Sequence, residues 1–204
     1  MGGRATRRPV EDRRTEILRA TVDLVTRDGF EAVRVADVAG ALGISPALVY
    51  YHFATKDRLV ADAFAFAAER ELGRLDRAIR SRRSGTEQMQ AVLRLYVPRR
   101  RTSDWRLWVC AWAAALRSPD LEQVSRDLDL RWAEAVERVI KHGSEQGEFT
   151  CPEPAVAAWR ICAMLDGLAL QSTVHPGPVT WAEVDELIRG YVGWELGVDG
   201  ALLV

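Results

Sequence analysis

Hydrophobic residues recur at a spacing of three to four along most of the chain, and Gly or Pro residues interrupt this pattern. Such spacing places apolar side chains on one face of a helix, whereas the strict alternation typical of strands is nearly absent. The stripe is clearest in one segment, in which these residues recur: Leu121, Val124, Leu128, Trp132, Ala135 and Val139. The pattern predicts an all-α fold with helices over residues 11–28, 35–42, 46–52, 56–80, 87–97, 104–117, 119–147, 152–172 and 180–196.

The segment of residues 35–56, VADVAGALGISPALVYYHFATK, carries the most specific pattern. A short helix, a turn containing Gly43 and a second short helix form a helix-turn-helix. Ser45 followed by Pro46 is a good start signal for the second helix, and Val49 is predicted to anchor that helix from below. A helix this short, with small residues at its start, can enter a DNA major groove.

The motif extends over residues 13–60, and its members are Gly29-Phe30, Val38-Ala39, Gly43-Ile44-Ser45, Tyr50-Tyr51-His52-Phe53, Lys56 and Leu59. In these residues the chain resembles the TetR family of bacterial transcription regulators. The resemblance implies an N-terminal three-helix helix-turn-helix DNA-binding domain, a C-terminal helical ligand-binding and dimerisation bundle, and a homodimer on a palindromic operator. Arg34 stands where the family usually has Thr or Ser, so it lacks the hydroxyl that would cap the helix, but it can still reach a phosphate.

Roles on DNA follow from the motif. Phosphate contacts are expected from Arg34, Tyr50 and Lys56, and contacts to base edges or sugars from Ser45, Pro46, Ala47 and Tyr51. The alternative for the two tyrosines is a place in the core. His52 either faces DNA or caps the turn.

Charge divides the chain into two unlike parts. The net charge is −1, but residues 1–100 carry 19 basic and 13 acidic residues, and residues 101–204 carry 9 basic and 16 acidic ones. A basic half suits a polyanion such as DNA. We predict a disordered basic arm over residues 1–10, a DNA-binding domain over 11–55 and a ligand-binding and dimerisation domain over 56–204. The arm's Arg4, Arg7 and Arg8 either reach a minor groove or form a solvated tail.

All seven tryptophans lie in the acidic half. They are either core residues or the lining of a ligand pocket, and tryptophan faces near carboxylates suit a cationic ligand. The order of Trp108, Trp112, Gly143 and the Asp166-Gly167-Leu168 segment is also loosely similar to the choline-responsive, BetI-like branch of the family. The candidate ligand-binding residues are Phe66, Trp105, Trp108, Trp112, Trp132, Trp159 and Asp166.

The last two predicted helices are apolar over more than one stripe, which indicates that each buries two faces. One face can meet a second copy in a four-helix contact, and the alternative is a fully internal helix in a monomer. The candidate dimerisation residues are Leu165, Leu168, Val184, Leu187, Ile188 and Tyr191.

Several classes are disfavoured. The chain lacks GxSxG, HExxH, a Gly-rich phosphate loop and CxxC, so we expect no enzyme, no catalytic residues, no metal site and no cofactor. The longest apolar run has ten residues and the three cysteines have no ligand spacing, so we expect no membrane segment and a cytoplasmic setting. The function that fits is a repressor released from double-stranded operator DNA by a small-molecule effector. The alternative is an architectural or activating DNA-binding protein without a ligand.

Overall fold

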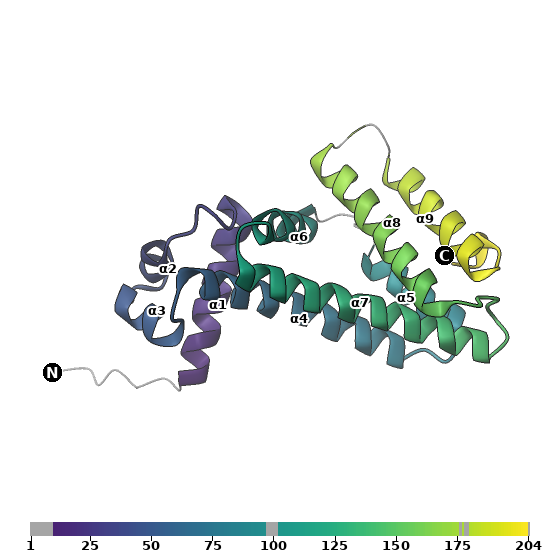
Figure 1. Ribbon diagram of the computed structural model, residues 1–204, viewed down its shortest axis with the longest axis horizontal. Helices are drawn as coiled ribbons and strands as arrows, with labels where there is room; N and C mark the ends of the chain where they lie inside the picture. The colour runs from purple at the N-terminus through teal and green to yellow at the C-terminus, as the bar shows by residue number, and fades with distance from the viewer. Residues whose placement is uncertain (1–9, 97–101, 176, 178–179, 204) are drawn as a thin grey trace. The chain divides into compact units, whose positions relative to one another are not determined.

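The computed structural model describes residues 10–96, 102–175, 177 and 180–203, and in this part of the chain it contains helices and no strand. The prediction of an all-α fold is therefore confirmed, and the predicted helix ends differ from the observed ones by at most two residues. A final 3₁₀ turn over Gly200–Leu203 was not predicted. The helices, labelled in Figure 1, are α1 (Val10–Asp28), α2 (Val35–Leu42), α3 (Pro46–His52), α4 (Lys56–Arg80), α5 (Gly85–Tyr96), α6 (Thr102–Ala115), α7 (Pro119–Glu145), α8 (Pro154–Val174) and α9 (Trp181–Leu196).

Two compact units make up the chain. The first contains the described residues up to Ala67 together with Cys110–Ser125, and the second contains Ala68–Val109 and Arg126 onward. The helices α4, α6 and α7 run from one unit into the other. The predicted boundary after residue 55 separates a DNA-binding domain from a ligand-binding domain, and it stays a prediction. The predicted arm of residues 1–10 lies almost entirely outside the described residues.

The first unit is a small helical core built on α1 to α3 and the start of α4. Its fully buried side chains include Ile17, Val38, Val49 and Leu59. The turn between α2 and α3 follows from its residues, because Gly43 adopts the left-handed conformation (φ 64°) that ends α2. Ser45 then caps α3, its hydroxyl accepting a hydrogen bond from the Leu48 amide at 3.2 Å. The predicted helix-turn-helix is therefore present.

The second unit contains the remaining parts of α4, α6 and α7, together with α5, α8 and α9. At one point α5 and α7 come so close that a side chain is excluded, because a Cβ on Gly85 would lie 2.3 Å from the Cα of Gly143. The amide of Gly85 donates to the side chain of Gln146 at 3.1 Å, and that of Thr86 donates to Glu148 at 2.8 Å. The turn after α7 thus satisfies the free amides at the start of α5.

Candidate nucleic-acid interface and effector site

The exposed face of α3 carries the predicted DNA contacts. Tyr50 is 51% and Tyr51 75% exposed, whereas Val49 between the turn and the core is fully buried. Pro46 and Ala47 are exposed as well. Both tyrosines are therefore surface residues, and the core alternative for them is wrong.

Ser45 and Arg34 both stand at helix starts. The hydroxyl of Ser45 is already used as the cap of α3. Arg34 is exposed at the N-cap of α2 and makes no side-chain cap hydrogen bond there, as the departure from the family pattern predicted. Its guanidinium remains exposed at the start of α2.

His52 ends α3 and is half-buried, with its ring edge-on to Tyr51 at 5.3 Å between centroids. Burial lowers the pKa of its imidazole, and the nearby guanidinium groups of Arg14 and Arg13 lower it further. A neutral imidazole at pH 7 can offer a hydrogen bond but not a positive charge.

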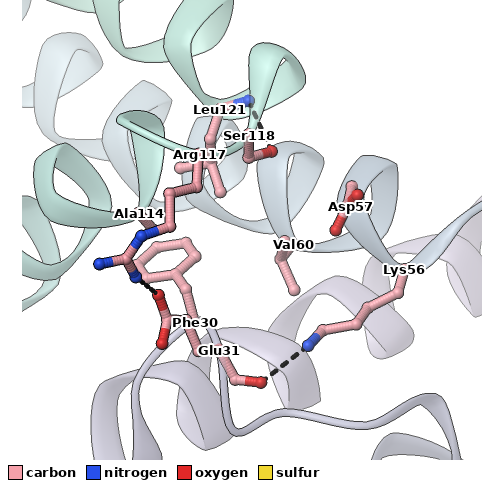
Figure 2. Close-up of a pocket in the computed structure, with 9 residues that line it drawn as sticks. All are labelled: Phe30, Glu31, Lys56, Asp57, Val60, Ala114, Arg117, Ser118 and Leu121. Carbon is pink, nitrogen blue, oxygen red and sulfur yellow. Dashed lines mark hydrogen bonds and ion pairs between the residues drawn. The ribbon is translucent and has the colours of Figure 1, made fainter.

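Lys56, the predicted phosphate contact at the start of α4, has an internal partner. Its ammonium donates to the backbone carbonyl of Glu31 at 2.8 Å, and the carboxylate of Glu31 pairs with Arg117. Figure 2 shows both interactions at a pocket of about 200 Å³ inside the first unit, which Phe30, Val60 and other residues also line. This hydrogen bond uses one of the three N–H donors of the ammonium, so it does not exclude a phosphate contact by Lys56.

In the second unit, Tyr96 of α5 joins three of the candidate ligand residues. Its hydroxyl donates a hydrogen bond to the carboxylate of Asp166 on α8. Its ring lies 5.1 Å from Trp132 of α7, edge-on, and 5.3 Å from Trp105 of α6, whose indole N–H donates to the Tyr96 carbonyl at 3.1 Å. We call Tyr96, Trp105, Trp132 and Asp166 the aromatic cluster. Sequence reasoning missed Tyr96, which looked like one more apolar position near a helix end.

The aromatic cluster contains a half-buried acid whose pKa is shifted. Burial raises the pKa of Asp166 to about 6, and the Tyr96 hydroxyl only partly opposes this. The same burial, with the charges of Asp166 and Asp129, raises the pKa of the Cys162 thiol to about 12. Two carboxylates acting on one buried region favour a positive charge there.

The other candidate ligand residues lie elsewhere. Trp108 is buried and donates its indole N–H to Glu71 at 3.1 Å, within the second unit. Phe66 and Trp112 belong to the first unit, and Trp159 is 57% exposed on α8. The structure thus gathers Trp105, Trp132 and Asp166 around Tyr96 within the second unit.

The candidate dimerisation residues divide by burial. Leu165, Val184 and Ile188 are buried within the chain itself, so they cannot form a surface for a second copy. Leu168 and Tyr191 are half-buried, and Leu187 is 54% exposed. The exposed apolar side chains of α8 and α9, which we call the α8/α9 apolar stripe, are Val156, Trp159, Leu170, Val174, Leu187 and Trp194.

Known proteins share both halves of this arrangement. A family model described as the BetI-type transcriptional repressor C-terminal domain matches residues 85–197, and one for bacterial regulatory proteins of the tetR family matches residues 17–63. The chain belongs to the TetR family. The resemblance in the helix-turn-helix and the looser one in the C-terminal half are both confirmed.

The relatives and solved structures agree with this assignment. The transcriptional regulator BetI of Stenotrophomonas maltophilia is 26% identical over 196 residues, which covers 90% of this chain and 93% of that protein. BetI 1 of Chromohalobacter salexigens is 25% identical over 190 residues, which covers 90% of this chain and 90% of that protein. A transcriptional regulator from Saccharomonospora viridis, solved in complex with choline, has the same fold, with a TM-score of 0.82, 22% identity and coverage of 91% of this chain and 98% of that one.

The family sets the class of activity. TetR regulators bind DNA, usually as dimers with small-molecule effectors, and they are not enzymes. Among the residues described, no helix is long and apolar enough to cross a membrane. In that same part of the chain, no three His, Cys, Asp or Glu side chains are grouped to hold a metal ion.

Proposed function

We propose that this TetR-family protein is a cytoplasmic repressor that leaves a palindromic operator when a small cationic effector binds the aromatic cluster. The observation that carries the proposal is the half-buried Asp166 carboxylate, which accepts a hydrogen bond from Tyr96, whose ring packs against two tryptophans. Aromatic rings and a carboxylate together bind quaternary ammonium groups through cation–π and charge attraction. The choline bound by the S. viridis regulator belongs to this class of cation.

The DNA side of the proposal rests on α3. The exposed tyrosine hydroxyls and the small residues Pro46 and Ala47 allow the helix to approach base edges, and the basic N-terminal half attracts phosphates. An architectural or activating DNA-binding protein without a ligand, which is the alternative, would have no function for a half-buried acid among aromatic rings. The aromatic cluster therefore favours effector control.

The dimer side of the proposal rests on the α8/α9 apolar stripe. Its members Val156, Trp159, Leu170 and Val174 share one face of α8, and Leu187 and Trp194 share one face of α9. Exposure of so many large apolar side chains to water is unfavourable. Packing of the stripe against the same helices of a second copy would remove this exposure and stabilise a dimer. Among the candidate dimerisation residues predicted from sequence, Leu187 belongs to this stripe.

A binding experiment with choline tests the effector side. We expect choline to quench the tryptophan fluorescence of the wild type, and Asp166→Asn and Tyr96→Phe to weaken the apparent affinity at least about tenfold, since each removes part of the cation site. Asp23→Asn, an exposed change on α1, is the matched control and should bind like the wild type. The neutral isostere 3,3-dimethyl-1-butanol separates charge from shape, and binding of this alcohol as tightly as choline would show that the site does not select a cation.

A further inference from the structure

The recognition helix α3 has only seven residues, too few to hold its own position. Its start is fixed by the Ser45 cap and its middle by buried Val49. Its end is Phe53, the C-cap residue, which is 2% exposed. What holds Phe53 therefore decides the direction in which the last turn of α3 points.

A guanidinium from a different helix lies on that ring. The central carbon of Arg14, on α1, is 4.7 Å from the centroid of Phe53. The same guanidinium forms an ion pair with the carboxylate of Asp62 on α4, whose side chain is only 11% exposed. Arg58 forms a second ion pair with this carboxylate, at 2.9 Å. One side chain thus ties α1 to the end of α3 and to α4.

We propose that Arg14 is a positioning residue for operator recognition, which sets the orientation of α3 through Phe53 and Asp62. A planar guanidinium can stack on a ring with its face while its edge pairs with a carboxylate. A lysine ammonium has the charge but cannot do both at once. The role therefore depends on the shape of the group and not only on its charge, and it rests on the DNA-reading role of α3 proposed above.

The chain offers a matched control for Arg14. Arg19 lies on the same helix and is exposed, so Arg19→Gln removes the same charge without touching Phe53 or Asp62. Charge loss alone should weaken operator and non-specific DNA alike. Loss of α3 orientation should weaken the operator only.

The test starts from a duplex selected by the wild-type protein out of random-sequence DNA. For Arg14→Gln we expect the ratio of operator to non-specific affinity to fall about tenfold or more, with Arg19→Gln keeping the wild-type ratio. Arg14→Lys should not restore the ratio, and Asp62→Asn should lower it too. An unchanged ratio in Arg14→Gln, or full rescue by Arg14→Lys, would overturn the proposal.

A second measurement needs no DNA. Because Arg14 helps to lower the pKa of His52, the imidazole signal of His52 in NMR should titrate at higher pH in Arg14→Gln than in the wild type or Arg19→Gln. The same titration in all three proteins, each first shown by circular dichroism to be folded, would overturn the proposed contact. Failure of the wild type to select any duplex would instead overturn the DNA-reading role of α3 and with it this inference.

Discussion

Asp166 is a carboxylic acid placed where its charge is poorly solvated. Its partner among the described residues is the Tyr96 hydroxyl, and burial raises its pKa to about 6. An acid whose pKa is higher in the folded than in the unfolded chain contributes stability at low pH and loses it as the pH rises through the folded pKa. A bound cation reverses this preference because it stabilises the ionised form.

The raised pKa of Asp166 predicts that the response of the protein to choline depends on pH. The rise in melting temperature caused by choline should be larger at pH 7.5 than at pH 5, because only the ionised Asp166 attracts the cation. Without choline, Asp166→Asn should be more stable than the wild type at pH 7.5, by up to about 2 kcal/mol, with the difference shrinking toward pH 4. Thermal unfolding across this range checks both effects, and a choline response of equal size at pH 5 and pH 7.5 would contradict the role of the Asp166 charge.

Sequence alone predicted some residues of the site and missed others for physical reasons. Asp166 stood out because a lone acid in an apolar helix is costly. Tyr96 did not stand out, since its neighbours come from three other helices. Lys56 has the expected residue type, but its hydrogen bond to the Glu31 carbonyl, 25 positions away, leaves no local sequence signal.

At the scale of helices, periodicity and capping residues predicted the elements almost completely. Gly43, Ser45 and Pro46 determine their turn by local conformational preferences, which sequence reveals directly. The sequence pattern does not show which apolar face of α8 and of α9 packs against the rest of the chain. Both faces are apolar, so Leu165, Val184 and Ile188 looked like interface residues although the chain buries them itself.

The crossing of α5 and α7 gives a prediction at this scale. Gly85→Ala should destabilise the protein by about 1–3 kcal/mol, because the added methyl group would lie 2.3 Å from the Cα of Gly143 and force the helices apart. Gly40→Ala on α2, where a Cβ meets nothing within 4 Å, is the control and should be neutral or stabilising. Urea unfolding measures both, and an unchanged midpoint for Gly85→Ala would show that the crossing is not tight.

At the scale of the whole molecule, the α8/α9 apolar stripe predicts assembly. Trp194→Glu should shift the protein from dimer to monomer at micromolar concentration, because it places a charge in a face that otherwise excludes water. Leu116→Glu changes an apolar residue outside α8 and α9 that is still more exposed than Trp194, and it should leave the dimer intact. Light scattering of the three proteins decides, and a monomeric wild type would contradict the proposed interface.

The charge asymmetry of the chain also belongs to this scale. A net charge of −1 conceals a basic half that carries the helix-turn-helix and an acidic half that carries Trp105, Trp132 and Asp166 of the aromatic cluster. The two halves can therefore bind ligands of opposite charge. For a repressor they must also be coupled, so that the effector binds better to the form of the protein that is off DNA.

The most direct test of this coupling is the affinity for the selected duplex measured with and without choline at pH 7.5. The account predicts that choline weakens duplex binding by the wild type by roughly 5- to 150-fold, the usual range of allosteric coupling, and leaves Asp166→Asn bound. The contradicting result is a wild-type protein whose tryptophans are fully quenched by choline and whose duplex affinity is unchanged.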